Sequence, residues 1–129
     1  MWCWGQNQRG QLGNGTSTNA STAPVRVLGD QVWTSVSAGG WHSCGTTSTG
    51  AAYCWGDNAF GQVGDGTITN RNRPTPVTGG LQLVQDATTW GRSCGVPATG
   101  EASCWGENSH SALRNVTRPN SPQPAAGSS

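Results

Sequence analysis

Residues 53–67 read Tyr-Cys-Trp-Gly-Asp-Asn-Ala-Phe-Gly-Gln-Val-Gly-Asp-Gly-Thr, and this stretch decides the fold because the chain repeats it. Residues 2–16 read Trp-Cys-Trp-Gly-Gln-Asn-Gln-Arg-Gly-Gln-Leu-Gly-Asn-Gly-Thr, and a third copy begins near the C-terminal end before it breaks off. The cysteines of the three copies lie 51 and 50 residues apart, at Cys3, Cys54 and Cys104. A fixed period near 50 residues indicates a repeat architecture.

The composition favours short strands and many turns. The chain has 129 residues, of which 20 are Gly and 7 are Pro, and it contains no Lys and only two Glu. A length of this size predicts one domain. The net charge of +1 gives no electrostatic case for a nucleic-acid partner or an anionic membrane. No apolar run approaches the length of a membrane span, so we also expect no membrane insertion.

The repeat divides the chain into four predicted units. Residues 1–5 are predicted to be the end strand of a truncated blade, where a blade is the small antiparallel sheet formed by one repeat. Residues 6–56 and 57–106 are predicted to be two full repeats. Residues 107–129 are rich in Pro and Ser, lose the repeat pattern, and are predicted to be a disordered tail. Because Met1 leads directly into a repeat, we expect a chain cut at its front, with any export signal upstream.

Strands and turns can be placed within each repeat. Alternating and β-branched residues predict strands over 24–28, 32–37, 41–46 and 51–55 in the first repeat, and over 81–87 in the second. The dipeptides Asn-Gly and Asp-Gly at 14–15 and 65–66 are strong turn formers in the loops between strands. Four short antiparallel strands per repeat of about 50 residues predict the blade of a β-propeller.

The repeated residues also resemble a known family. Cys-Trp-Gly-x-Asn-x-x-Gly-Gln-Leu-Gly-x-Gly-Thr, then Pro-Val, then Trp-x-x-Val-Ser-Ala-Gly-x-x-His-Ser-Cys is similar to the regulator of chromosome condensation repeat. The cysteines make the chain resemble bacterial, exported members. The resemblance implies an all-β fold: two four-stranded antiparallel blades of a seven-bladed β-propeller, incomplete, with an irregular C-terminal tail. Seven such blades need about 350 residues, so we expect further blades or self-association.

The cysteine spacing predicts disulfides. Cys44 and Cys54 face each other in a hairpin centred on residue 49, and Cys94 and Cys104 do so around residue 99. Facing positions bring Cβ atoms close to disulfide geometry. The alternative is that these cysteines are reduced, buried apolar side chains. Disulfides predict an extracellular or cell-surface location.

No catalytic, metal or cofactor site is predicted. Residues 91–95, Gly-Arg-Ser-Cys-Gly, fit a nucleophile elbow around Ser93, but that motif needs a strand followed by a helix, and the only downstream His is His110. Zinc is disfavoured because no Cys-x-x-Cys occurs. Asp57 and Asp65 could suggest calcium, but their counterparts in the first repeat are Gln6 and Asn14.

The tryptophan beside each repeated cysteine, at positions 4, 55 and 105, is predicted to pack between blades. The turn at 39–40 and the long loop after Trp55 are predicted to share one rim of the blade. Arginine and aromatic side chains on loops are frequent anchors for protein partners. The predicted partner-binding rim consists of Gln8, Arg9, Trp41, His42, Phe60, Arg71, Arg73, Trp90 and Arg92.

The function predicted from these observations is binding, without an enzymatic activity. The leading interpretation is a protein–protein recognition module of an exported or surface repeat protein, with an unidentified protein as its partner. The family resemblance adds two alternatives, a guanine-nucleotide exchange factor for a small GTPase and a secreted inhibitor of an enzyme. A hydrolase that uses Ser93 is the remote alternative.

Overall fold

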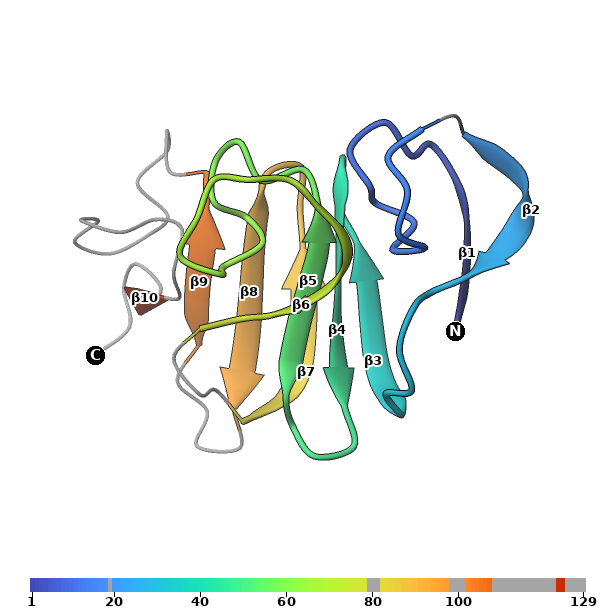
Figure 1. Cartoon of the computed structure of the whole chain (residues 1–129). Coiled ribbons are helices and arrows are strands. Elements are labelled where there is room, and N and C mark those ends of the chain that lie inside the picture. Colours follow the sequence, from blue (N-terminus) through green and yellow to red (C-terminus); the bar gives the residue numbers. More distant parts are fainter. Residues whose placement is uncertain (19, 79–81, 98–101, 108–122, 125–129) are drawn as a thin grey trace.

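The chain folds into short antiparallel strands joined by turns and long loops, as a computed structural model shows (Figure 1). The all-β prediction is confirmed, since the part of the chain that the structure describes contains no helix. No candidate for a membrane-spanning helix exists among those residues either. The structure describes residues 1–18, 20–78, 82–97, 102–107 and 123–124.

The first four-stranded sheet has the order β3-β4-β5-β6 and is antiparallel throughout. Burial alternates along β3 between half-buried and exposed residues, whereas β4 is buried at every position except Ser43. The contrast arises because β4 is a central strand with both faces covered. The strands are β3 (Trp33–Ala38), β4 (His42–Thr47), β5 (Ala52–Gly56) and β6 (Arg71–Pro76).

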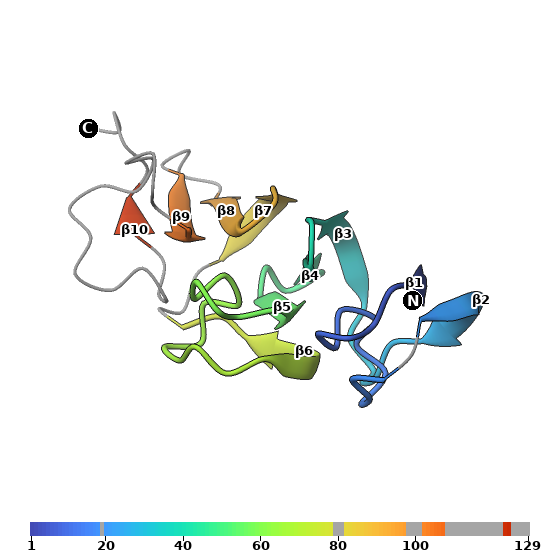
Figure 2. The same cartoon turned by 90° about the horizontal axis from the view of Figure 1, so that it is seen from above.

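The second four-stranded sheet repeats this arrangement, with the order β10-β9-β8-β7. A separate antiparallel pair, β1 (Trp2–Gly5) and β2 (Ser21–Arg26), precedes the first sheet. Seen from above, the pair and the two sheets follow one another side by side (Figure 2). The strands of the second sheet are β7 (Leu83–Thr88), β8 (Arg92–Pro97), β9 (Ser103–Gly106) and β10 (Gln123–Pro124).

The sheets do not follow the units 6–56 and 57–106. We expected the strand at 24–28 to share a blade with the strand at 32–37, but β2 pairs with β1 instead. The outer strand of the first sheet, β6, comes from the following repeat and pairs with β5. The loop after Trp55 turns the chain back along β5, so each repeat completes the sheet of the one before it. The predicted disordered tail, residues 107–129, lies outside the described residues except for Glu107 and β10, and β10 pairs with β9.

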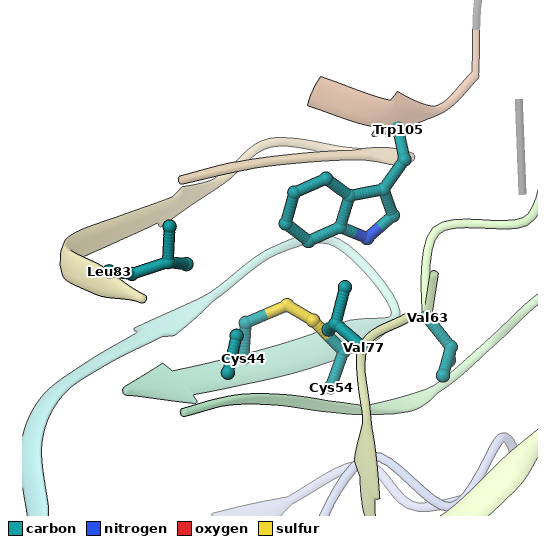
Figure 3. Close-up of a cluster of buried hydrophobic side chains, with 7 residues drawn as sticks. Cys44, Cys54, Val63, Val77, Leu83 and Trp105 are labelled. Carbon is teal, nitrogen blue, oxygen red and sulfur yellow. A yellow bond between two sulfur atoms is a disulfide. The ribbon is translucent and has the colours of Figure 1, made fainter. Parts of the chain in front are cut away.

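The core lies between the two sheets, where β3 and β4 contact β7. Trp105 lies over Val77 and the Cys44–Cys54 pair, with Leu83 beside them (Figure 3). Gly45 leaves room on the other face of the first sheet for the ring of Trp33, which also contacts Tyr53 and Trp55. The buried cluster consists of Cys44, Ala52, Cys54, Val63, Val77, Leu83 and Trp105.

Candidate functional site

The four cysteines of the two hairpins lie in facing positions, as their spacing predicts. Cys44 on β4 is the register partner of Cys54 on β5, and Cys94 on β8 is the partner of Cys104 on β9. The Cα atoms of each pair are 4.1 Å apart, and the structure joins each pair by a disulfide. Cys3, which holds the same place on β1, forms no disulfide within the described residues.

A tryptophan of each sheet is tied to a loop of the preceding repeat. The indole Nε1 of Trp55 donates a hydrogen bond of 3.0 Å to the carbonyl oxygen of Gln11, and Trp105 donates one of 2.9 Å to that of Gln62. A serine on the neighbouring strand donates to the same carbonyl in both cases, because Ser43 bonds Gln11 and Ser93 bonds Gln62. These two indoles were predicted to pack between blades, and the structure gives each of them a specific hydrogen-bond partner, the Gln carbonyl of the preceding repeat.

His42 and Ser93 form a buried contact between the two sheets. The His42 Nε2 atom lies 2.9 Å from the Ser93 Oγ atom, and both side chains are almost completely buried. The Ser93 hydroxyl donates its proton to the Gln62 carbonyl at 2.7 Å, so Nε2 must carry the proton that joins it to Ser93. A histidine that donates to this hydroxyl cannot also take its proton, and no substrate reaches a buried oxygen. The pair is therefore structural in this geometry.

Burial controls the charge of His42. It lowers the pKa of this imidazole to about 4, and the nearby Asp57 carboxylate and the Arg92 backbone oppose that shift only in part. His42 is therefore neutral at physiological pH. Its Nδ1 atom has no hydrogen-bond partner among the described residues. We expected His42 on the exposed rim, which is wrong, because the side chain is enclosed between the sheets.

Asp86 joins the two sheets at a second point. Its Oδ1 atom accepts a 3.0 Å hydrogen bond from Thr46, and its Oδ2 atom accepts a 2.7 Å bond from Ser37. Val36 holds the corresponding place in the first repeat, where it is exposed. A buried carboxylate needs such partners, so the departure from the repeat pattern at Asp86 has a structural explanation.

Two aromatic residues of the predicted rim do come together. Phe60, on the loop after β5, and Trp90, on the turn between β7 and β8, have ring centroids 5.9 Å apart. Their exposed fractions are 43% and 61%. Gly40 lies against Trp90. The next residue, Trp41, is half-buried and lies on the same rim. These loops all lie at the upper end of the sheets in Figure 1.

The arginines and the glutamine of the predicted rim divide into two groups. Arg71 is paired with Asp65 at 2.6 Å, and Arg92 with Glu107 at 3.3 Å. Burial alone would raise the pKa of Asp65, but hydrogen bonds from Thr67 and Arg71 outweigh it and the pKa lies below its usual value. The exposed residues, which form no ion pair within the described ranges, are Gln8, Arg9 and Arg73.

The calcium candidates accept hydrogen bonds from their own loop, Asp57 from Gln62 and Asp65 from Thr67, and two repeated asparagines hold the same loops in shape. The Asn58 side chain donates to the backbone oxygens of Thr67 and Thr69 and accepts from the backbone of Val63, and Asn7 does the equivalent for Thr16 and Leu12. No cluster of His, Cys, Asp or Glu that could hold a metal ion occurs in the described parts of the chain.

Known proteins with this sequence pattern identify the family. The Regulator of chromosome condensation (RCC1) repeat matches residues 1–45 and 49–95, and a second description of the same repeat matches residues 33–62. The chain belongs to the RCC1 repeat family. The resemblance inferred from the repeated residues is thereby confirmed.

Curated relatives of this RCC1-repeat chain are eukaryotic. It is 46% identical over 66 residues to "Probable E3 ubiquitin-protein ligase HERC4" of Homo sapiens, covering 50% of this chain and 6% of that protein. It is 38% identical over 72 residues to "Protein RCC2 homolog" of Danio rerio, covering 54% of this chain and 14% of the relative. The chain thus spans a small part of the length of these relatives.

Solved structures support the propeller. Human WBSCR16 superimposes with a TM-score of 0.85 at 28% identity, covering 95% of this chain and 34% of that one. Yeast RCC1 (Prp20), in a complex with Kap60, gives a TM-score of 0.83 at 23% identity, covering 96% of this chain and 32% of that one. The latter likeness shows the fold alone. The described strands therefore form part of an RCC1-type β-propeller.

The relatives correct two expectations about origin and location. The predicted extracellular or cell-surface location is wrong, because HERC4, the RCC2 homolog and Prp20 are intracellular eukaryotic proteins. The secreted-inhibitor alternative depended on that location and falls with it. A bacterial, exported type and disulfide bonding likewise find no support among these relatives.

Sequence reasoning missed three features of this site: the Gln11 and Gln62 carbonyls, the contact of His42 with Ser93, and the role of Asp86. The first had a signal, since both glutamines recur with the period of the tryptophans. The other two join different repeats through His42 and Asp86, whose counterparts in the other repeat are Arg92 and Val36. No local pattern marks such a pair.

Proposed function

We propose that this chain is a non-enzymatic protein-recognition module that binds a protein partner through the rim formed by Phe60 and Trp90. The observation that carries the proposal is the exposure of these two contacting rings, which come from loops of the two sheets. Aromatic anchors of this kind dominate the energetics of protein interfaces. Positive charge comes from Arg9, on the loop between β1 and β2, and from Arg73, on β6; both are exposed and form no ion pair among the described residues.

Two of the similar solved structures are of one protein, yeast RCC1 (Prp20), which binds other proteins. Yeast RCC1 was solved bound to Kap60, and Prp20p of Saccharomyces cerevisiae binds Gsp1p and histones. The buried Ser93, whose hydroxyl is already engaged by Gln62, supports the absence of an esterase activity. The HERC relatives are described as ubiquitin ligases, and this chain spans only a few per cent of their length.

The test is a binding measurement with three purified probes: Kap60, Gsp1p and core histones. For whichever of these probes the wild-type chain binds, we expect the double variant Phe60→Ala, Trp90→Ala to bind at least about tenfold more weakly. Such a loss is typical of hot-spot aromatic residues. Val32→Ala with Val84→Ala is the matched control, because both valines are exposed and lie away from the rim pair. Equal affinities for the wild type and the rim variant would overturn the proposal.

A second candidate is guanine-nucleotide exchange on a small GTPase, which the family resemblance suggests and the binding of Prp20p to Gsp1p favours. Exchange is distinguished from simple binding by measuring the rate at which Gsp1p releases a fluorescent GDP analogue. Acceleration by wild type that is lost with the rim variant would support exchange, whereas binding without acceleration would leave recognition alone.

A further inference from the structure

A hydrogen-bond network in the contact between the two sheets leaves one buried oxygen with room for donors. The Gln62 carbonyl oxygen accepts from the Trp105 indole at 2.9 Å and from the Ser93 hydroxyl at 2.7 Å. The one proton of the Ser93 hydroxyl is used in this bond, so its oxygen can act only as an acceptor towards its other neighbours. Two lone pairs of this buried oxygen are therefore available to donors.

Two side chains of β4 lie against the Ser93 oxygen. The His42 Nε2 atom donates to it at 2.9 Å. The Cys44 Sγ atom lies 3.5 Å from it, a distance at which a thiol can donate its proton. A disulfide sulfur carries no proton and donates nothing. The network around Ser93 is therefore complete only when Cys44 is a thiol.

The surroundings of the pair accommodate the reduced state. Cys54 is 1% exposed and lies with Cys44 beneath Trp105 (Figure 3). A reduced cysteine in such a place packs as a small apolar side chain. The hairpin does not depend on the sulfur–sulfur bond for its register, because β4 and β5 face each other at five positions of an antiparallel ladder. The disulfide spans a separation of only 10 residues, and so short a loop restricts the unfolded chain less than a long one.

The oxidised state is equally accessible from this geometry. Cys44 and Cys54 are register partners, and the structure joins them by a disulfide. Oxidation adds that bond and removes the proton that Cys44 offers to Ser93. The relatives HERC4, the RCC2 homolog and Prp20 are intracellular, and glutathione and thioredoxin keep most thiols reduced in such compartments. A pair that fits both states can respond to a change in that balance.

We propose that Cys44 and Cys54 form a reversible thiol–disulfide couple whose reduced form is stabilised by a hydrogen bond from the Cys44 thiol to Ser93. Its reaction partner is a small thiol. The couple lies inside the contact between the sheets, whereas the Phe60–Trp90 rim is exposed, so either proposal can fail without the other.

Reduction proceeds by two thiol–disulfide exchanges. The thiolate of the reductant attacks one sulfur of the pair, the bond between the two cysteines breaks, and the other cysteine leaves as a thiolate that takes a proton from water. A second reductant thiolate attacks the mixed disulfide, releases the remaining cysteine in the same way, and leaves as the disulfide of the reductant. Two electrons thus pass from the reductant to the pair. Both sulfurs are buried, so exchange requires the contact between the sheets to open.

The test measures the ratio of dithiol to disulfide at equilibrium. The full chain is held in buffers of reduced and oxidised dithiothreitol, its thiols are blocked with N-ethylmaleimide, and mass spectrometry reads each cysteine. We expect Ser93→Ala to lower the dithiol-to-disulfide ratio of Cys44 and Cys54 at least about threefold, because oxidation no longer breaks a hydrogen bond. The partners that Ser93→Ala leaves at His42 and Gln62 are unpaired in both states, so their cost cancels in the ratio.

A matched variant controls for the loss of a hydroxyl beside a cysteine. Ser43 donates to the Gln11 carbonyl, and no bond joins it to the Cys44 sulfur among the described residues, so Ser43→Ala should leave the ratio unchanged. Equal ratios for the wild type and Ser93→Ala would overturn the proposal. An equal shift in Ser43→Ala would also overturn it, as would a wild-type pair that is reduced only when circular dichroism shows the chain unfolded.

Infrared spectroscopy tests the bond itself and does not depend on Ser93→Ala folding. The chain is reduced with a phosphine, which has no S–H group of its own. The S–H stretching band that Cys44→Ala removes should lie at a lower frequency than the band that Cys54→Ala removes, because a hydrogen bond weakens the S–H bond of its donor. Bands at the same frequency would overturn the proposal.

Discussion

Trp4 and Trp55 occupy the same place in the repeat, yet one is 64% exposed and the other 1%. Both follow a cysteine and precede a glycine on a strand of matching register. The difference lies outside the motif. Trp55 has the Gln11 carbonyl and Gly13 of the preceding loop against its indole, whereas Trp4 has no such loop among the described residues.

The comparison shows what one repeat does for the next. The Cys-Trp-Gly motif sets the strand and its register, but burial of the tryptophan comes from the Gly-Gln-Leu-Gly loop of the repeat before it. Each repeat contacts its neighbours, as in other repeat proteins, so stability depends on these contacts between neighbours. Substitutions at the complete and the incomplete contacts should therefore differ in their cost.

The largest expected effect is at the buried tryptophan. Trp55→Ala should lower the free energy of unfolding by about 3–5 kcal/mol, since it removes a large core side chain and its hydrogen bond. Trp4→Ala should change it by about 0.5 kcal/mol or less, as for an exposed residue. Urea unfolding of the two variants measures the difference. Equal losses would show that the motif, and not the preceding loop, stabilises the fold.

His42 should make stability depend on pH. The unfolded imidazole binds a proton below its ordinary pKa of 6.5, whereas the folded one does so only near 4. The unfolded state therefore binds more protons in this window, and the unfolding free energy should fall as pH drops from 6.5 towards 4, by up to about 3 kcal/mol. Urea midpoints across this window measure the slope. His42→Gln should flatten it, and an unchanged slope would contradict the assignment.

Asp86 should matter only while its partner is polar. Asp86→Val leaves the Thr46 hydroxyl buried without an acceptor and should cost about 1–3 kcal/mol. Adding Thr46→Val should recover part of this loss, because residues 46 and 86 are then both apolar, whereas the Ser37 hydroxyl still lacks its acceptor. A double-mutant cycle in urea tests the coupling. Additive losses would mean that Thr46 and Asp86 do not stabilise each other.

The smallest effect concerns two loop glycines with similar backbones. Gly64 and Gly66 have φ angles of +78° and +84°. A Cβ on Gly64 would lie 2.5 Å from the Trp105 Nε1 atom, whereas one on Gly66 has nothing within 4 Å. Both alanine variants carry the backbone cost of about 1–2 kcal/mol, and Gly64→Ala should lose about 1 kcal/mol more. Thermal unfolding measures the pair, and an equal loss would argue against the close indole contact.

Much of the fold could be predicted because it repeats. The expected strands at 32–37, 41–46 and 51–55 lie within one residue of β3, β4 and β5 at each end. The facing positions of Cys44 and Cys54 followed from hairpin symmetry alone. Sheet membership was harder, since β6 pairs with β5 across a loop of 14 residues, from 57 to 70, and no local signal tells which sheet a strand completes.

The site could be predicted less well than the fold. Phe60 and Trp90 were placed on one rim by the alternation of strand direction, and their contact agrees with that placement. His42 was placed with them by its position at a strand start, but a side chain there can turn inward. The sequence does not reveal this, because Ser93, which contacts His42, and Gln62, which accepts the Ser93 proton, belong to another repeat.

Hydrogen exchange of the indole N–H groups, followed by NMR, tests most directly whether the preceding loop buries each repeated tryptophan. The account predicts that the Nε1 protons of Trp55 and Trp105 exchange at least about a hundredfold more slowly than that of Trp4, because both are bonded to a loop carbonyl inside the fold and Trp4 has no such bond among the described residues. Similar rates for all three indoles would contradict it.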